Sequence, residues 1–403
     1  MRFLFSPPAE QAAGLLTLPW SQPLARWQDE RMIEVRQRGL HRHIVRFVSE
    51  GDVVYVLKEL PERFARREYA LLRELKQLEI PSVEVLGISI DRPDSMDAIL
   101  VTRFLEHSTT YRSLLSNPRG ALPLDELLDG MVELLVRLHL AGFMWGDCSL
   151  SNTLFMADAG EVAAYLVDAE TSEKHSSLSD GQREYDVQIA QERVAGELMD
   201  LQAGNLLVDS VDPIEMADQI ELRYTALWTE LTREDVISTD EQRYKIAERM
   251  RRLNELGFDI DEVELVAVDG GNKLRLKTRV AEPGHNRRKL LARTGLHVQE
   301  NQARRMLNDI AGFRAWLEQR AGHSVPETVA ANRWLAEVYD PVINAIPKHL
   351  RDKLDEAEIF HEVLEHRWFM SEQSNQDIGT TKAARDYFER VLPEVPDELS
   401  QTP

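Results

Sequence analysis

Three oxygen-bearing side chains in the middle of the chain have a spacing that suggests chemistry. Residues 142–155 read G-F-M-W-G-D-C-S-L-S-N-T-L-F and place Asp147 five positions before Asn152. The apolar run Y-L-V-D-A-E-T then delivers Asp168 at its end, 16 positions after Asn152. Carboxylate and amide oxygens are ligands that hard divalent cations prefer, and a carboxylate can also orient or accept a proton. Gly, Asp, Ser and Asn are equally common in surface turns, so the loop alone leaves both interpretations open.

With Asp168 added, the pattern resembles the catalytic half of the protein-kinase-like superfamily, nearest to the lipopolysaccharide-kinase and aminoglycoside-phosphotransferase branch. The catalytic loop of that family has an Asp followed five positions later by Asn, as in Asp147 and Asn152. The resemblance implies an ATP-dependent kinase, a phosphotransferase with an alcohol group as acceptor, in which Asp147 orients or accepts the proton of the hydroxyl. It also implies that Asn152 and Asp168 hold Mg²⁺ against the nucleotide phosphates.

Two positions depart from the family pattern without removing these three side chains. Trp145 stands before Gly146, where a His is usual. Asp168-Ala169-Glu170 replaces the Asp-Phe-Gly of protein kinases, as happens in the branches that act on small molecules. The resemblance covers roughly residues 30–225, and a protein of these branches does not need a mobile activation loop.

A lysine and a carboxylate complete the catalytic residues that the resemblance implies. Lys58 ends the run V-V-Y-V-L-K, where the family places the lysine that contacts the α- and β-phosphates. On the helix that follows, Glu68 interrupts an apolar stripe of Phe64, Leu71, Leu75 and Leu78. A carboxylate that faces a core needs a cation, so Glu68 is the predicted partner of Lys58, whereas Glu74 lies off the stripe. Both residues also have a plainer interpretation as solvated surface charges.

The turn that should cover the phosphates differs most from the family. Residues 36–43 contain one glycine, Gly39, whereas the family usually has several, which let backbone N–H groups approach the phosphates. The candidate nucleotide-binding residues in this turn are therefore Gly39, Arg38 and Arg42, with side-chain charge replacing backbone contacts. Weak nucleotide binding and a solvated basic hairpin tip are the alternatives.

Asp186 is the candidate for structural support of the catalytic loop. It lies in R-E-Y-D-V at the start of a predicted helix, where the family often has an Asp that accepts backbone N–H groups of the loop. Capping of its own helix is the alternative role. Cys148 lies beside Asp147, and we assign it no catalytic role because phosphoryl transfer requires no thiol.

The elements that must position these residues follow from the periodicity of the apolar positions. Short β-branched runs predict strands, and apolar residues at helical spacing predict helices. The predicted strands cover residues 33–35, 44–48, 53–57, 83–90 and 98–104, and the predicted helices begin at Pro61, cover 125–140 and fill most of 185–257. The fold class is α+β: a bilobal protein-kinase-like fold with a small antiparallel N-lobe sheet and a helical C-lobe, followed by an α-rich domain with a β-hairpin. We expect an N-lobe with an N-terminal extension at 1–104, a helical catalytic C-lobe at 105–230, the α-rich domain at 231–395 and a polar tail at 396–403.

The C-terminal region carries a local basic patch at residues 273–305 in a chain of net charge −21. Residues 263–280 predict a hairpin with its turn at 269–272, and alternation places four basic residues on one face of its second strand: Lys273, Arg275, Lys277 and Arg279. This face suits the phosphates of a polyanion, or it pairs with Glu262 and Glu264 on the neighbouring strand. The region resembles an uncharacterised domain that accompanies kinase-like domains in actinobacteria, and the resemblance supplies no function.

One further motif in this region resembles a metal site only superficially. In H-E-V-L-E-H at 361–366 the histidines are five apart, whereas a zinc-binding helix needs four, and Glu358 and His361 form a single Glu-x-x-His pair. Intrahelical pairs of His361 with Glu365 and of Glu362 with His366 are the favoured explanation.

Composition limits the remaining choices. The 403 residues contain 43% hydrophobic and 29% charged residues, which is typical of a globular protein, and no apolar run approaches the length of a membrane-spanning helix. One cysteine excludes an internal disulfide, and the first 20 residues lack the continuous apolar core of a secretory signal, so we expect a cytoplasmic protein. The alternatives to a kinase are a pseudokinase-type binding module and a nucleic-acid-binding regulator that uses the basic patch. The hydroxyl acceptor, a small molecule or a protein, is not named by the sequence.

Overall fold

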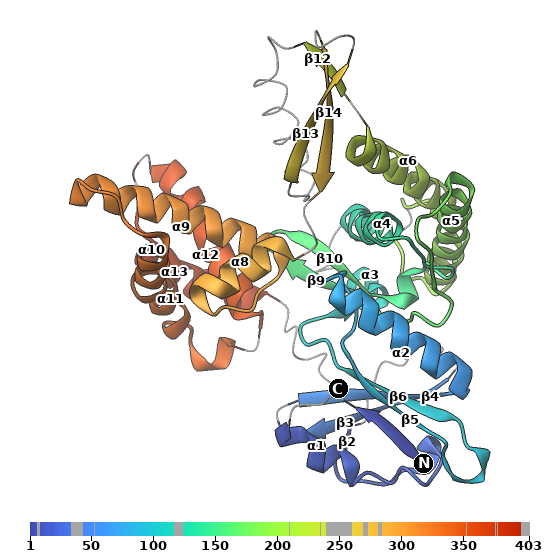
Figure 1. Ribbon diagram of the computed structural model, residues 1–403. Coiled ribbons are helices and arrows are strands. Elements are labelled where there is room, and N and C mark those ends of the chain that lie inside the picture. Colours follow the sequence, from blue (N-terminus) through green and yellow to red (C-terminus); the bar gives the residue numbers. More distant parts are fainter. Residues whose placement is uncertain are drawn as a thin grey trace. The chain divides into compact units, whose positions relative to one another are not determined.

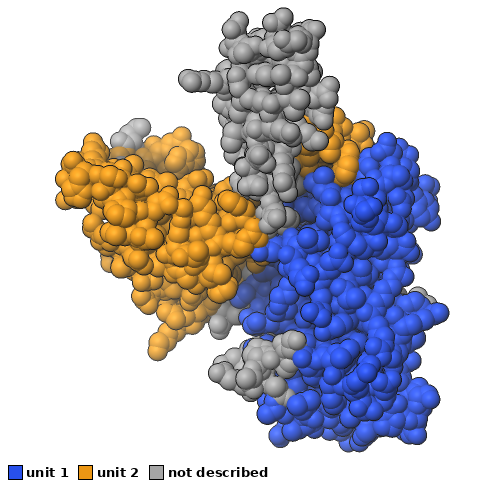
Figure 2. All heavy atoms as spheres, in the orientation of Figure 1, with its two compact units in different colours: residues 1–156, 163–221, 400–403 blue, residues 157–162, 222–399 orange. Residues whose placement is uncertain are grey.

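A computed structural model describes most of the chain as two compact units (Figures 1 and 2). The described residues are 1–5, 9–33, 43–51, 53–116, 124–208, 210–233, 235–238, 260–268, 273–280, 284–351, 353–374, 376 and 378–395. The first unit takes its described residues from 1–156 and 163–221, and the second takes them from 157–162 and 222–399. Among the described residues, no helix is both long enough and apolar enough to cross a membrane.

A six-stranded antiparallel sheet forms the N-terminal lobe of the first unit (Figure 1). Its spatial order is β1-β5-β6-β4-β3-β2, with strands β1 (Arg2–Phe5), β2 (Met32–Ile33), β3 (Ile44–Glu50), β4 (Val53–Leu60), β5 (Val85–Ile90) and β6 (Ala98–Arg103). One face packs on α1 (Ala9–Leu16) and η1 (Leu24–Arg26), through a core that includes Trp20 and Trp27. Tyr55 and Leu57 of β4 enter this core, and alternation along the strand therefore directs Lys58 to the other face. Residues 44–48, 53–57, 83–90 and 98–104 are strands as predicted, apart from their ends, and β1 is an addition to the predicted sheet.

Helix α2 (Glu62–Gln77) follows β4 directly and carries Glu68. Its buried positions are Ala65, Glu68, Leu71, Leu72 and Leu75. The predicted stripe was therefore wrong at both ends, because Leu78 is exposed beyond the last turn and Phe64 is only half-buried. The guanidinium of Arg63 covers the Phe64 ring at 4.3 Å from its centroid, which stabilises the ring at the surface.

Helices dominate the rest of the first unit. The main helices are α3 (Tyr111–Ser116), α4 (Leu124–Leu140), α5 (Asp180–Ala203) and α6 (Pro213–Thr232), the last of which runs past the boundary of the unit. Short strands form two small sheets, one of β10 (Glu161–Leu166), β9 (Thr153–Asp158) and β7 (Thr109–Thr110), and one of β11 (Glu173–Lys174) and β8 (Phe143–Met144). Helix α4 agrees with the helix predicted over 125–140 and is buried on most of its surface. It leads through β8 into the loop at residues 145–152, which carries Asp147 and Asn152 and is called the catalytic loop below after the family pattern that it resembles.

The second unit contains a three-stranded antiparallel sheet in the order β12-β14-β13. The strands are β12 (Asp235–Ser238), β13 (Ile260–Val268) and β14 (Lys273–Val280). The helix predicted through 235–238 is wrong, because these residues form the edge strand β12, in which Val236 and Ile237 pair with β14. The hairpin strands agree with the prediction, whereas the expected turn at 269–272 and the expected helix over 239–257 lie outside the described residues.

Helices pack around an aromatic core in the remainder of the second unit. They are α8 (His285–Thr294), α9 (Glu300–Ala321), α10 (Glu327–Trp334), α11 (Asp340–Asn344), α12 (Glu356–Ser374) and α13 (Thr380–Arg390), with the shorter turns η6 (Leu335–Tyr339), η7 (Lys348–Leu350) and η8 (Leu392–Glu394). Trp334, Tyr339 and Phe360 form the centre of this core, with ring centroids 5.0–5.7 Å apart.

Residues 157–162, at the tip of the β9–β10 hairpin, belong to this second unit. Asp158 accepts the backbone N–H groups of Asn301 and Gln302. Glu358 accepts the backbone N–H of Ala159 and the side-chain amide of Gln302. Glu358 therefore holds a turn of backbone, and the described residues contain no group of three or more His, Cys, Asp or Glu that could hold a metal. The predicted pair of His361 with Glu365 is present at 3.1 Å.

The second predicted intrahelical pair of α12 is wrong. His366 contacts Asp386 of α13 at 2.9 Å, and Glu362 accepts the hydroxyl of Tyr387. Both side chains therefore link α12 to α13, since a partner on a packed neighbouring helix competes with a partner one turn away.

Candidate active site

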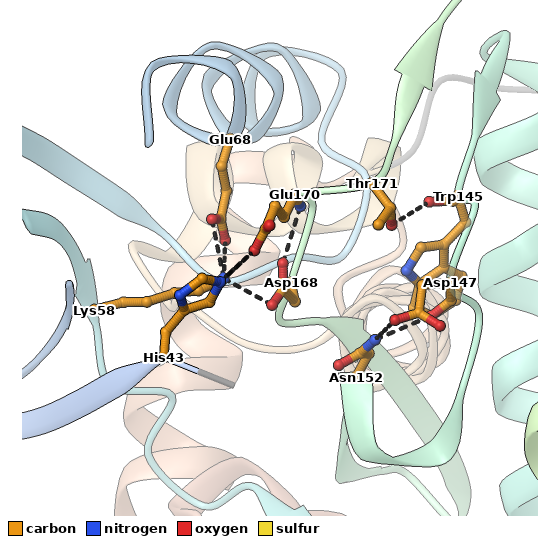
Figure 3. A network of polar contacts seen from close by, with 9 residues as sticks. All are labelled: His43, Lys58, Glu68, Trp145, Asp147, Asn152, Asp168, Glu170 and Thr171. Carbon is orange, nitrogen blue, oxygen red and sulfur yellow. Dashed lines mark hydrogen bonds and ion pairs between the residues drawn. The ribbon is translucent and has the colours of Figure 1, made fainter. Parts of the chain in front are cut away.

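The lysine of β4 lies at the centre of a cluster of carboxylates (Figure 3). The Nζ of Lys58 is 3.1 Å from Oε2 of Glu68, 2.7 Å from Oδ2 of Asp168 and 3.7 Å from Oε2 of Glu170. Strand β4, helix α2 and the segment after β10 each supply part of the cluster. The structure thus brings together Lys58, Glu68 and Asp168, three of the residues predicted from the sequence to form the site.

The cluster holds more negative than positive charge. Burial raises the pKa of Glu68, and the nearby carboxylate of Asp168 adds to the effect, while Lys58 opposes it. Burial disfavours the ammonium of Lys58, but the carboxylates of Glu68 and Asp168 outweigh burial and raise the pKa of the lysine. Three carboxylates, those of Glu68, Asp168 and Glu170, therefore lie around the single ammonium of Lys58.

Glu170 and His43 extend the cluster, and neither is among the site residues predicted from the sequence. His43 precedes β3, and its Nε2 lies 2.8 Å from Oε2 of Glu170 (Figure 3). The backbone N–H of Glu170 donates to Oδ1 of Asp168 at 2.9 Å, which fixes the carboxylate of Asp168 between this N–H and Lys58. The departure of Asp168-Ala169-Glu170 from Asp-Phe-Gly was the signal that could have indicated Glu170.

The catalytic loop holds Asp147 and Asn152 in contact. The Nδ2 of Asn152 donates to the backbone carbonyl of Asp147 at 3.0 Å and to its Oδ2 at 3.1 Å, as Figure 3 shows. The backbone N–H of Val167 donates to the carbonyl of Asn152 at 3.0 Å, which joins the loop to the segment that carries Asp168. Because the Nδ2 of Asn152 faces Asp147, its Oδ1 is not used in that contact and suits a hard cation.

Local conformation explains the glycine in the loop. Gly146 has φ +79°, and a Cβ at this position would lie 2.9 Å from the carbonyl oxygen of Thr171. Only glycine fits both conditions without strain. Ser149 then begins the short helix η3 (Leu150–Asn152), with its Oγ accepting the backbone N–H of Asn152.

Asp186 of α5 holds the start of the loop. Its carboxylate accepts the backbone N–H of Trp145 at 2.6 Å and of Gly146 at 2.8 Å, and the Nε2 of His139 lies 3.0 Å from it. Asp186 is completely buried, so its contacts are to the loop and to α4. His139, at the end of α4, was not selected from the sequence, although it lies in the L-H-L-A-G segment that precedes the loop.

The remaining loop residues are structural. Trp145 is completely buried, and its indole N–H has no hydrogen-bond partner. Cys148 is also buried, and burial raises the pKa of its thiol well above the usual value, which makes a reactive thiolate unfavourable. Gly39, Arg38 and Arg42, the candidate nucleotide-binding residues of the turn, lie outside the described residues.

Comparison with known proteins identifies two family domains in the chain. Residues 32–194 match the lipopolysaccharide kinase (Kdo/WaaP) family, and residues 226–392 match a domain of unknown function, DUF4032. No curated protein matches the chain.

Two solved structures illustrate the range of structural similarity. A structure of WaaP in complex with acyl carrier protein has 14% sequence identity to this chain and a TM-score of 0.38. The match covers 64% of this chain and 99% of the WaaP chain. A chain of the yeast RNA Pol II CTD kinase CTDK-1 complex has 16% sequence identity to this chain and a TM-score of 0.26. The match covers 37% of this chain and 52% of that kinase chain.

Proposed function

Because residues 32–194 carry a domain of the lipopolysaccharide kinase (Kdo/WaaP) family, with a kinase-like fold, we propose that the protein is an ATP- and Mg²⁺-dependent phosphotransferase. The observation that carries the proposal is the position of Lys58, whose ammonium contacts both Glu68 and Asp168. This is the arrangement that places a lysine beside nucleotide phosphates and a metal-binding carboxylate in kinase-type phosphoryl transfer.

Asp147 would act on the acceptor. In the transfer step, an acceptor hydroxyl oxygen forms a bond to the γ-phosphorus while the bond from that phosphorus to the β–γ bridging oxygen breaks. ADP leaves with the electron pair of the broken bond, and the hydroxyl proton passes to the carboxylate of Asp147. The contact of Asn152 with Asp147 orients the carboxylate for this role.

Asn152 and Asp168 would hold Mg²⁺, which neutralises phosphate charge when bound. Lys58 contacts the carboxylate of Asp168 at 2.7 Å, and Glu68 keeps the ammonium in place from the other side. Lys58 would then share its charge between this pair and the α- and β-phosphates. Gly39, Arg38 and Arg42 remain the proposed residues for covering the nucleotide.

The acceptor in this proposal is a small molecule or a protein with a free hydroxyl, and the protein acts in the cytoplasm, where ATP is abundant. A pseudokinase-type binding module is the main alternative, since its nucleotide site would look similar in the absence of turnover. The intact set of Asp147, Asn152 and Asp168 favours catalysis, because a protein that only binds a partner has no need of a base beside the acceptor.

A polyanion-binding role for residues 273–305 receives less support. The register of the sheet places Glu262 opposite Arg279 and Glu264 opposite Lys277. Further along the patch, four arginines contact acids of the same unit: Arg287 with Glu300, Arg293 with Glu327, Arg304 with Glu161 and Arg305 with Glu365. Much of the positive charge therefore has an internal partner.

The proposal is tested by Asp147→Asn, which preserves the size of the side chain and removes the proton acceptor. Release of labelled phosphate from ATP, with water or an added alcohol as acceptor, should fall by about 100-fold or more, while binding of ATP stays within about twofold of wild type. Asp180→Asn is a matched control, since Asp180 is an exposed acid in an ion pair with Arg183. Turnover by Asp147→Asn equal to wild type would show that the base has been assigned to the wrong residue.

A further inference from the structure

One stripe of helix α5 contacts the catalytic loop at three successive points. Asp186, Arg193 and Glu197 are seven and four residues apart, a spacing that places them on one helical face. Asp186 accepts the first loop N–H groups, as described above, and Glu197 accepts those of Leu150 at 2.8 Å and Ser151 at 2.9 Å. Helix α5 therefore fixes the loop on both sides of Asp147.

Arg193, the middle member of the stripe, contacts the side chain of Asp147 itself. Its Nε lies 2.9 Å from Oδ1 of Asp147, whereas Oδ2 of the same carboxylate accepts from Asn152. The arginine is 60% exposed and the aspartate 31% exposed, so the pair faces solvent, where substrate would enter. A contact between an arginine and the proposed base is different in kind from the backbone contacts of Asp186 and Glu197.

Arg193 pairs with Asp147 of the loop rather than with an acid of its own helix. Glu197 stands one turn further on, at the i, i+4 position that ordinarily forms an intrahelical ion pair. Within the described part of the chain, Arg193 makes no ion pair with Glu197, whose carboxylate is used by the loop N–H groups. The neighbouring Glu192 accepts from Gln188 at 3.1 Å.

The guanidinium also supplies a charge that the loop lacks. Cys148, Ser149, Leu150 and Ser151 separate Asp147 from Asn152, and none of them is basic. Lys58 is already shared among three carboxylates. A phosphoryl group in transfer spreads negative charge over its outer oxygens, and cations placed there lower the barrier. Arg193 lies within ion-pair distance of Asp147 and is 60% exposed, so its guanidinium, which carries five N–H donors, is accessible to such oxygens.

We propose that Arg193 is a further catalytic residue, whose guanidinium binds the γ-phosphoryl group during its transfer to an acceptor at Asp147. The inference rests on the proposed function, because it requires ATP at Lys58 and an acceptor at Asp147. Arg193 forms and breaks no covalent bond in the step, and it contributes hydrogen bonds that are strongest when the phosphoryl group lies between ADP and the acceptor.

The test compares a ground-state complex with a mimic of the transferring phosphoryl group. Calorimetry measures binding of ADP with Mg²⁺, alone and with aluminium fluoride, to the full chain and to Arg193→Gln. The variant should bind ADP and Mg²⁺ within about twofold of wild type and should lose about tenfold or more of the added affinity that aluminium fluoride gives. Arg193→Lys should recover part of this loss, since it keeps the charge without the planar donors.

Arg66→Gln is the matched control, because Arg66 is an arginine of α2 in a partly exposed ion pair with Glu62. This control should bind both complexes like wild type. Arg193→Gln that binds the aluminium fluoride complex as tightly as wild type would overturn the assignment of Arg193 alone, as would a wild type that binds ADP and Mg²⁺ but gains no affinity from aluminium fluoride. Wild type that does not bind ADP and Mg²⁺ would overturn the proposed function and this inference together.

Discussion

Each unit of the protein buries a carboxylate, and the two carboxylates meet different partners. Glu68 in the first unit is 1% exposed and lies 3.1 Å from the ammonium of Lys58. Asp158 in the second unit is 2% exposed and accepts backbone N–H groups at 2.8 and 3.1 Å at the start of α9. Burial raises the pKa of both carboxylates, to about 7 for Asp158.

The partners indicate a role in the proposed active site for Glu68 and a purely structural role for Asp158. The partner of Glu68 also contacts Asp168, so the network continues to the proposed metal and nucleotide. The partners of Asp158 are peptide N–H groups at a helix start, which satisfy the carboxylate and lead to no ligand site. Burial of an acid is therefore not sufficient evidence of function, and the identity of the partner decides.

Substitution of Asp168 should cause the largest loss of activity, because this carboxylate contacts Lys58, the partner of Glu68, and is a proposed Mg²⁺ ligand. Asp168→Asn removes an anionic ligand without changing the volume of the side chain. Mg²⁺-dependent turnover should therefore fall by at least about 100-fold, while the fold stays intact. Circular dichroism and phosphate release at matched Mg²⁺ measure the two outcomes. Activity equal to wild type would refute the metal assignment.

Lys58 and Glu68 should act as one unit. Lys58→Met and Glu68→Gln each remove one side of the ion pair and should each weaken the use of ATP. The double variant should lose less than the sum of the single losses, with a coupling free energy of about 0.5–3 kcal/mol in kcat/KM. Strict additivity in this cycle would mean that the two side chains do not interact in the working enzyme.

Asp158 should instead change stability with pH. Its folded pKa of about 7 lies above the usual 3.8, so the folded state holds the proton more tightly than the unfolded state. The protonated carboxyl of Asp158 therefore stabilises the folded state, and this stabilisation is fully present below about pH 4. The free energy of unfolding falls by at most roughly 1.4 kcal/mol per pH unit as the pH rises from there to about 7. Urea unfolding of wild type and Asp158→Asn at several pH values measures it. A difference between the two proteins that stays constant over this pH range would contradict the pKa.

The smallest effect concerns the basic face of β14. If the face pairs only with Glu262 and Glu264, which the register places opposite Arg279 and Lys277, then replacing Lys273, Arg275, Lys277 and Arg279 with Gln should change stability by no more than about 1 kcal/mol per exposed pair. If the face binds a polyanion instead, the variant should lose affinity for RNA or DNA, and the slope of log K against log salt should flatten by roughly 0.7–0.9 per lost phosphate contact. Filter binding over a salt series distinguishes the two, and retention of nucleic acid by wild type near 0.15 M salt would favour the polyanion.

The sequence allowed a prediction of those site residues that have a local signature. Asp147 and Asn152 share a fixed spacing, and Glu68 is an acid in an apolar helical stripe. The family and the kinase-like fold of the first unit were predicted from the same residues and are confirmed by the match of residues 32–194.

Other parts of the site have no local signature. Arg193 and Glu197 look like ordinary exposed charges of a helix, and only the packing of α5 against the loop gives them partners. His43 meets Glu170 across 127 positions of sequence, a contact that periodicity does not encode. The exposed end of the predicted α2 stripe at Leu78 shows the same limit, since spacing alone does not reveal that the helix ends at Gln77.

The central claim is that the cluster around Lys58 binds ATP with Mg²⁺ for catalysis. The most direct measurement is a titration of the full chain with labelled ATP, with and without Mg²⁺, followed by detection of labelled phosphate released or transferred in the same samples. We expect saturable binding that tightens with Mg²⁺ and is accompanied by turnover. Binding that is unaffected by Mg²⁺ and produces no released or transferred phosphate would contradict it and would indicate a pseudokinase-type binding module.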